Sequence, residues 1–191
     1  MDDLVTNKPN VGRYEKLLDA GATIALYGMQ NVFKELNQLV QELVEQTRAE
    51  VEAHLFFSQE GLKGLAPHYD CVDILVLQVA GTKHWQLSSQ RANNPINGKG
   101  VATIYDPNAA HSEYELNPGD VLYIPRGTFH HALALSETSL HVTVPLKFPT
   151  RVDLLSSMLE AAFKQDEMRA SLALQNASDL KDAFDLSLIH I

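Results

Sequence analysis

The feature that most constrains the fold of this chain is a series of short strand-like runs between residues 68 and 146. Each run is rich in β-branched and apolar residues, and turn-forming residues separate it from the next. Many short strands separated by turns are typical of barrels and jelly rolls. We therefore predict a mainly β fold with flanking helices. The predicted strands span residues 68–79, 82–89, 101–105, 113–117, 120–125, 130–135 and 139–146.

Helical periodicity lies on both sides of this β region. Apolar residues recur every three or four positions between residues 31 and 53, which is the spacing of an amphipathic helix. The pattern returns from Arg151 onward. We expect a lead-in with a helix at residues 1–52, a barrel at 53–148 and a helical segment at 149–185.

The two ends of the chain look cut. The last six residues, LSLIHI at 186–191, are what translation of a transposon-end sequencing adapter produces. We expect this segment to be an adapter-derived artefact and a natural C-terminal region to be missing, so His190 is excluded as a ligand. We also expect the N-terminus to be truncated.

Charge and composition exclude several classes of protein. A formal net charge of −9 over 191 residues provides no basic field for a phosphate backbone, which disfavours direct nucleic-acid binding. Cys71 is the sole cysteine, so no internal disulfide can form. The first 16 residues lack the apolar stretch of a signal peptide, and no apolar window reaches the length of a membrane span. We expect a cytoplasmic protein.

Three residues form a candidate metal site. His68 and Asp70 are two positions apart on a predicted strand, so their side chains point to the same face. Residues 118–130, PGDVLYIPRGTFH, predict a turn, a strand, a second turn and then His130 at the start of another strand. Two histidines and one carboxylate form the facial set that leaves open positions on non-haem iron, where a co-substrate and dioxygen bind. We predict that His68, Asp70 and His130 hold a catalytic metal.

The remaining histidines receive weaker assignments. His131 follows His130 and points to the opposite face, so we expect it at the surface or on the substrate side. We interpret His141, on another predicted strand, as a hydrogen-bonded core histidine. His84 and His111 have no partner that the sequence identifies. A three-histidine, one-glutamate metal site is disfavoured, because no second histidine and glutamate follow His68 at the required spacing.

Lys83 is a candidate for binding an anion. If Ala80 and Gly81 form a two-residue hairpin turn, Gln78 pairs with Lys83 and Val76 with Trp85. Lys83 would then share the face that carries the metal ligands and would need an anion in the apolar interior. A dicarboxylate with one end on the metal would supply that anion. The alternative is a surface lysine at the end of a strand.

Residues 61–87, 116–132 and 139–144 together resemble the ribosomal oxygenases of the JmjC/cupin-4 family, and the likeness extends from about residue 22 to about residue 174. Members of this family have a double-stranded β-helix core, use iron(II), 2-oxoglutarate and dioxygen, and hydroxylate ribosomal proteins. The resemblance implies metal ligands at His68, Asp70 and His130, and a lysine for the 2-oxoglutarate carboxylate at Lys83.

The chain departs from the family at three positions. Near the co-substrate it has His54 and Phe56 where members have an asparagine and a tyrosine, and Pro145 where they have a serine. A histidine can still donate a hydrogen bond to a carboxylate, whereas phenylalanine and proline side chains cannot. The family's dimerisation and winged-helix regions do not fit in this chain, so we expect a homodimer only for a longer protein.

We therefore expect a 2-oxoglutarate-dependent dioxygenase acting on a protein substrate, which the resemblance implies is a ribosomal protein. A non-catalytic cupin that serves as a binding or assembly module is the main alternative, because His54, Phe56 and Pro145 replace family residues. A metal cupin with chemistry independent of 2-oxoglutarate is a third hypothesis.

Overall fold

The computed structural model describes residues 12, 16–17, 22–60, 65–98 and 102–171. The chain divides into two units, residues 1–148 and 149–191, and each is described by itself. The strands of the first unit are β1 (Ile24–Leu26), β2 (Glu50–Val51), β3 (His54–Gln59), β4 (Asp73–Ala80), β5 (Lys83–Arg91), β6 (His111–Leu116), β7 (Val121–Ile124), β8 (Thr128–Ala134) and β9 (Thr138–Lys147).

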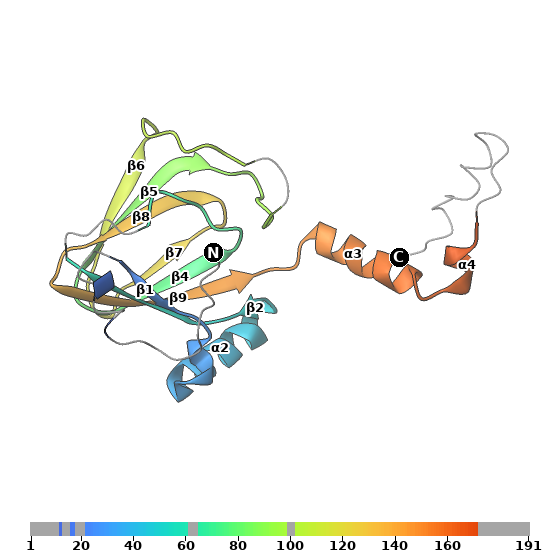
Figure 1. Ribbon diagram of the computed structural model, residues 1–191, viewed down its shortest axis with the longest axis horizontal. Helices are drawn as coiled ribbons and strands as arrows, with labels where there is room; N and C mark the ends of the chain where they lie inside the picture. The colour runs from blue at the N-terminus through green and yellow to red at the C-terminus, as the bar shows by residue number, and fades with distance from the viewer. Residues whose placement is uncertain (1–11, 13–15, 18–21, 61–64, 99–101, 172–191) are drawn as a thin grey trace. The chain divides into compact units, whose positions relative to one another are not determined.

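These strands form two antiparallel sheets (Figure 1). The larger sheet has the order β1-β3-β9-β4-β7, and β2 also pairs with β9, whereas the smaller sheet has the order β6-β5-β8. Short antiparallel strands arranged in two sheets are the jelly-roll architecture that the turn-separated runs predicted. The prediction of a mainly β fold with few helices is confirmed.

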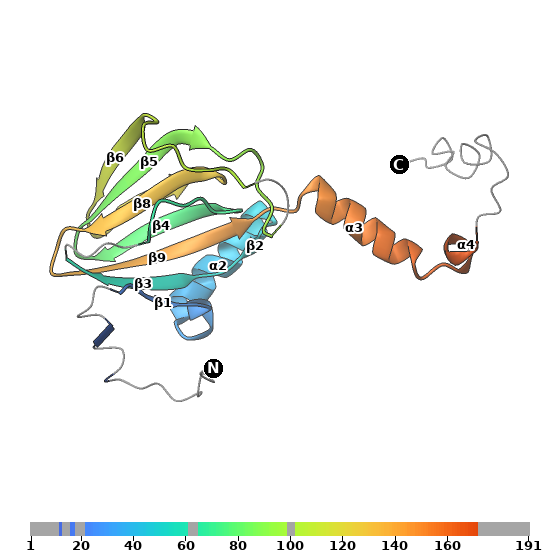
Figure 2. The same cartoon turned by 45° about the horizontal axis from the view of Figure 1, so that its top comes forward.

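A helix covers the outer face of the larger sheet, as Figure 2 shows. After the single turn η1 (Met29–Asn31), α2 runs over Lys34–Thr47 and buries Val40 against Val142, Val144 and Leu146. The predicted helix over 31–53 is longer than the observed one. Arg48 ends α2 with a left-handed φ of 60°, and the chain then joins the sheet as β2.

The second apolar cluster lies on the inner faces of both sheets. Ile74, Val76 and Ile124 come from the larger sheet, and Trp85 and Leu116 come from the smaller one. Along β4, alternate residues point to opposite faces, and both faces are covered, one by the smaller sheet and the other by α2. This explains why the sequence of β4 is almost continuously apolar.

Some predicted strand boundaries are wrong. Residues 102–105 form no strand, and Ile104 is 86% exposed because no neighbouring strand pairs with it. The predicted strand at 68–79 begins only at Asp73, and His68 contributes an isolated bridge to His130. The strands β1, β2 and β3 were not predicted. β1 and β2 have only three and two residues, too few to show a periodic pattern.

The predicted hairpin at Ala80 and Gly81 is also wrong. β4 pairs with β7 and β9, whereas β5 pairs with β6 and β8, so this connection crosses from one sheet to the other. Gly81 has a φ of +64°, and a Cβ there would lie 2.0 Å from the Thr138 carbonyl oxygen. Val76 and Trp85 therefore meet across the core and are not cross-strand neighbours.

The second unit contains α3 (Arg151–Ala162) and α4 (Asp166–Arg169). A reciprocal pair of hydrogen bonds between Thr150 and Asp153 caps the start of α3. The expected helical segment at 149–185 is thus interrupted after Ala162, and its residues 172–185 lie outside the described residues. The expected artefact at 186–191 lies outside the described residues. In the described part of the chain, no helix is long and apolar enough to cross a membrane.

Candidate metal centre and co-substrate pocket

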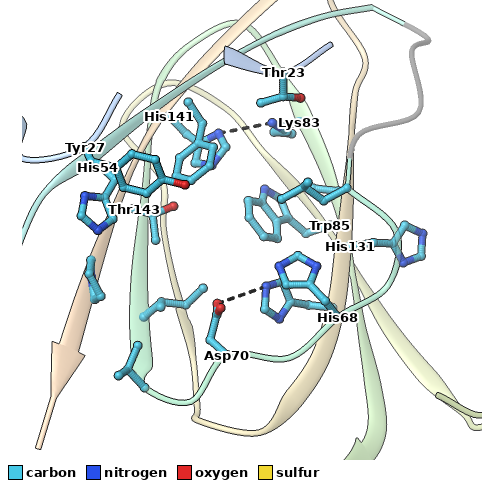
Figure 3. A pocket seen from close by; sticks show the side chains of 17 residues that line it. Thr23, Tyr27, His54, His68, Asp70, Lys83, Trp85, His131, His141 and Thr143 are labelled. Carbon is cyan, nitrogen blue, oxygen red and sulfur yellow. Dashed lines mark hydrogen bonds and ion pairs between the residues drawn. The ribbon is translucent and has the colours of Figure 1, made fainter. Parts of the chain in front are cut away.

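A pocket opens between the two sheets, and Figure 3 shows the side chains around it. Residues of β3, β4 and β9 line one side, and residues of β5 and β8 line the other. The lining includes Thr23, Tyr27, His54, Phe56, Leu65, His68, Asp70, Val72, Ile74, Lys83, Trp85, His130, His131, Ala132, His141, Thr143 and Pro145.

The structure brings His68, Asp70 and His130 together at one end of this pocket. One potential ligand atom from each residue lies within 4.8 Å of the others. His130 Nε2 is 3.6 Å from Asp70 Oδ2, and the ring centroids of His68 and His130 are 4.5 Å apart. Among the described residues, this is the one group of three such side chains close enough to hold a metal ion together. Two imidazoles and a carboxylate suit a divalent first-row transition metal.

Backbone pairing places the two histidines. His68 and His130 exchange backbone N–H to carbonyl hydrogen bonds of 3.1 and 2.8 Å, although His68 lies outside any regular strand. The side-chain Nδ1 of His68 donates to the Ala66 carbonyl, and that of His130 donates to the Thr128 carbonyl, each at 2.9 Å. The Nδ1–H of each ring is therefore engaged, and Nε2 keeps its lone pair for a metal.

The turn before β8 holds the segment that carries Asp70. The Gly127 N–H donates to the Asp70 carbonyl at 3.0 Å, and the Arg126 N–H donates to Asp73 Oδ1 at 2.6 Å. Gly127 has a φ of +82°, and a Cβ there would lie 2.2 Å from the Ala92 carbonyl oxygen. The Pro-Arg-Gly turn thus requires glycine for both its conformation and its space.

Burial keeps the ring of His130 neutral. The side chain is 4% exposed, and desolvation is the main cause that lowers its pKa. Burial also lowers the pKa of His131, as do the nearby histidines. The ring of His131 lies at the edge of the pocket and is directed away from Asp70 (Figure 3). The two adjacent rings therefore point in different directions, as expected for neighbouring residues of a strand, and His130 is the one directed toward Asp70.

Lys83 lies in the same pocket and is 4% exposed, although the hairpin that first suggested its orientation does not exist. Its Nζ donates to Ser58 Oγ at 3.0 Å and to His141 Nδ1 at 3.3 Å. Burial lowers the pKa of Lys83 to about 8. Both of these acceptors are neutral, and an ammonium has three N–H groups, so one donor is left for an anion. The alternative of a surface lysine is wrong.

His141 is buried and hydrogen-bonded, as predicted for a core histidine. Its pKa is lowered to about 2, first by burial and then by the charge of Lys83. Sequence reasoning missed Ser58 and Thr23, whose hydroxyl oxygens are 3.2 Å apart beside Lys83. Strand parity could have identified Ser58, because residues 54, 56 and 58 share one face of β3.

A family model described as a JmjC domain matches residues 25–154. The chain belongs to the JmjC domain family. The family expected from the sequence motifs is therefore confirmed.

Curated proteins similar to this JmjC domain are much longer than it is. A Dictyostelium discoideum protein named bifunctional lysine-specific demethylase and histidyl-hydroxylase NO66 is 32% identical over 149 residues, or 75% of this chain and 29% of that protein. Mouse ribosomal oxygenase 2 (Mus musculus) is 34% identical over 126 residues, or 64% of this chain and 27% of that protein. The chain thus spans less than a third of these relatives.

Solved structures share the fold of the JmjC domain. Escherichia coli ycfD matches with a TM-score of 0.66 and 21% identity, over 87% of this chain and 47% of that one. The Escherichia coli ribosomal oxygenase YcfD in complex with cobalt and 2-oxoglutarate matches with a TM-score of 0.63 and 20% identity, over 87% and 46%. The predicted cupin/JmjC-type jelly roll is confirmed.

The three departures from the family pattern all line the pocket. His54 uses both ring nitrogens, since Nδ1 accepts from the Gly28 N–H at 3.4 Å and Nε2 is 3.4 Å from Glu52 Oε2. Phe56 stacks on His141, and Pro145 forms part of the wall. That His54 and Phe56 contact the co-substrate stays a prediction, and the geometry makes them wall residues of the JmjC pocket.

Two histidines without a predicted partner lie outside the pocket lining. His84 and His111 both approach Glu113 of β6, at 3.9 and 3.2 Å. The hydrogen bond from Gln86 is the largest cause that lowers the pKa of Glu113. These side chains lie away from the metal ligands and from Lys83, and His111 is exposed.

Proposed function

We propose that this JmjC domain is the catalytic domain of an iron(II)- and 2-oxoglutarate-dependent oxygenase that hydroxylates a protein side chain. The observation that carries the proposal is the meeting of His68, Asp70 and His130 with the buried cation of Lys83 in one pocket. A bound metal and a buried ammonium can hold the two ends of one dicarboxylate. The names of the curated relatives, histidyl-hydroxylase and ribosomal oxygenase, support the same reaction class.

The residues present fit an iron(II) ion. His68 and His130 would each present Nε2, because the Nδ1–H of each ring is held by a backbone carbonyl. Asp70 would supply the carboxylate ligand. Bound iron(II) supplies dioxygen activation coupled to the oxidative decarboxylation of 2-oxoglutarate, which drives hydroxylation of a C–H bond.

The chain's own residues would orient the co-substrate and limit access of water. Lys83 donates to Ser58 and His141, and its remaining N–H would be available to the 2-oxoglutarate carboxylate that lies farther from the metal. Val72, Ile74 and Trp85 provide an apolar wall beside the metal ligands. An apolar wall excludes water and strengthens the electrostatic interactions inside the pocket.

The substrate and partners belong to the same proposal. We propose a protein substrate and, from the names of the relatives, a ribosomal protein. A net charge of −9 suits a basic protein partner better than a nucleic acid. A cytoplasmic location and a homodimer stay predictions.

One observation favours a second candidate function. Phe56 and Pro145 line the pocket but donate no side-chain hydrogen bond, so a non-catalytic cupin that binds or assembles with partners is the alternative. A metal cupin whose reaction does not use 2-oxoglutarate is the third hypothesis, and its lack of 2-oxoglutarate dependence distinguishes it from the oxygenase.

Succinate formation tests the proposed function. The purified chain is incubated in air with iron(II), ascorbate and 2-oxoglutarate, without a protein substrate, and with His130→Ala as the inactive control. We expect slow uncoupled formation of succinate by the wild-type chain and none by the variant. If neither protein forms succinate and titrations show that the wild type binds neither iron(II) nor 2-oxoglutarate, the oxygenase assignment is wrong.

A further inference from the structure

Three contacts hold the ring of His141 in one orientation. Phe56 stacks on one face, with the ring centres 5.1 Å apart and the planes within 5° of each other. Trp85 lies nearly perpendicular to the imidazole, at 83° and 5.4 Å. Lys83 Nζ lies 3.3 Å from Nδ1 (Figure 3). Rotation out of this plane would break the stacking on Phe56, and a 180° flip would move Nδ1 away from Lys83, so the two contacts together hold the direction of Nε2.

The contact with Lys83 also determines the tautomer of His141. A protonated lysine only donates hydrogen bonds, so Nδ1 must be the acceptor. The pKa of His141 is lowered to about 2, so the ring is neutral at physiological pH and carries its single proton on Nε2. His141 is therefore a hydrogen-bond donor at Nε2 and cannot accept there.

This donor faces the pocket. Among the described residues, no side chain or carbonyl accepts a hydrogen bond from Nε2, and the buried side-chain atoms without a partner are Gln78 Oε1 and Trp85 Nε1. Nε2 is therefore not sealed inside the protein, and His141 lines the pocket although it is 4% exposed. A buried side chain with a free donor at a pocket wall is suited to bind an acceptor group of a ligand.

We infer that His141 is a second donor, beside Lys83, for the carboxylate of bound 2-oxoglutarate that lies farther from the metal. The inference rests on the function proposed above and names a residue that binds the co-substrate. Lys83 supplies a charged N–H, and the neutral Nε2–H of His141 supplies another from β9. The two groups can then bind the two oxygens of one carboxylate.

This role also accounts for the stacking of Phe56. A phenylalanine provides no hydroxyl for the co-substrate, but its face fixes the ring that supplies a donor in its place. Phe56 and His141 are direct cross-strand neighbours in the β3–β9 ladder, so their side chains share the inner face of the sheet. Phe56 is thus a positioning residue that acts through His141.

Ligand binding to the manganese(II)-loaded chain tests this inference without turnover. Trp85, the single tryptophan, contacts His141, so its fluorescence reports occupancy of the pocket. Two ligands are titrated by fluorescence and calorimetry: 2-oxoglutarate, and 2-oxopentanoate, which has the same metal-binding end but no far carboxylate. His141→Phe is compared with the wild type, and His111→Asn, at an exposed histidine outside the pocket lining, is the matched control.

We expect His141→Phe to weaken 2-oxoglutarate binding about ten- to hundredfold, as for loss of a hydrogen bond to a charged group. Binding of 2-oxopentanoate and of manganese(II) should be unchanged, and His111→Asn should match the wild type with both acids. Unchanged 2-oxoglutarate affinity in His141→Phe, or an equal loss for both acids, would overturn the role of His141. If the wild type binds neither acid, the proposed function itself fails, and this inference fails with it.

Two conservative variants separate donation from packing. In His141→Gln, the side-chain amide can reach the place of Nε2 and donate there, whereas in His141→Asn it reaches only the place of Nδ1. We expect the glutamine variant to bind 2-oxoglutarate more tightly than the asparagine variant, with equal binding of 2-oxopentanoate. The reverse order would show that His141 acts only as a partner of Lys83.

Discussion

At the scale of single residues, Lys83 is an unusual group because a lysine side chain is buried, with only 4% of it exposed. Its ammonium lies in an apolar pocket beside two neutral acceptors, Ser58 Oγ and His141 Nδ1. Burial lowers its pKa to about 8, so the free protein holds a lysine that titrates near physiological pH. A carboxylate ligand would favour the charged form and raise that pKa again.

This arrangement predicts a pH dependence of 2-oxoglutarate binding. Below pH 8 the lysine is already protonated, so its contribution to affinity should be constant. Above pH 8 binding must take up a proton, and affinity should fall by up to about tenfold per pH unit. Calorimetry with the manganese(II)-loaded chain, in buffers of different ionisation enthalpy, measures both the affinity and the proton uptake.

Lys83→Met is the control for this pH dependence. The variant should bind 2-oxoglutarate more weakly and without proton uptake at alkaline pH, because methionine fills a similar volume and does not titrate. If the affinity of Lys83→Met for 2-oxoglutarate fell as steeply above pH 8 as that of the wild type, the group that titrates would not be Lys83.

At the scale of elements, the turn between β7 and β8 joins the strand that carries His130 to the segment that carries Asp70. The Gly127 N–H reaches the Asp70 carbonyl, and its own carbonyl accepts from the Ala92 N–H. The metal ligands thus depend on a turn that contributes no ligand itself.

Gly127→Ala should destabilise the chain by about 2 kcal/mol or more, because alanine would be strained at φ +82° and would meet the Ala92 carbonyl. Metal affinity should fall as well. Urea unfolding and metal titration measure the two effects. Gly98→Ala is the matched control, since Gly98 has a φ of +66° but open space around its Cβ position. If both variants lost the same free energy of unfolding, backbone strain alone would explain the loss, and the contact with the Ala92 carbonyl would not contribute.

The end of α2 offers a stabilising substitution. Arg48 holds a left-handed φ of 60°, which costs a residue with a side chain more than it costs glycine. Arg48→Gly should raise the free energy of unfolding by up to about 1 kcal/mol, as measured by urea unfolding. Arg48→Ala, which keeps the strain and removes the charge, should give no such gain. A similar gain from both substitutions would point to the charge of Arg48.

At the scale of the whole molecule, the candidate metal ligands link parts of the chain that are far apart in sequence. His68 and Asp70 precede β4 of the larger sheet, and His130 lies on β8 of the smaller sheet. A bound ion would therefore cross-link the two sheets in the folded state only. Metal binding and folding should be coupled.

Metal should accordingly raise the melting temperature of the chain. At a free metal concentration about 100 times the Kd, the expected stabilisation is about 2.7 kcal/mol, and a chelator should reverse it. Differential scanning calorimetry with manganese(II) and with EDTA measures the shift. Neither manganese(II) nor EDTA should change the melting temperature of His130→Ala. An equal rise in melting temperature in that variant would mean that the ion binds at another site.

The site was predictable from sequence wherever its signal is local. The spacing of His68 and Asp70, the turn before His130 and the alternation along residues 83–87 all depend on neighbours a few positions away. Lys83 and Trp85 share an inward face whichever strands flank them, so the predicted orientation of Lys83 is correct although the hairpin behind it is wrong.

The pairing of strands was decided by the tertiary structure. The sequence by itself determined a mainly β chain, the turns between its strands and the inward parity of Lys83, Trp85 and His130, because side-chain alternation along a strand is a local property. Only the fold decided that β4 and β5 belong to different sheets, and that Ser58 and His141 meet Lys83 from β3 and β9. Those contacts join residues 25 and 58 positions away from Lys83, and burial of apolar faces, which depends on the whole chain, selects among such pairings.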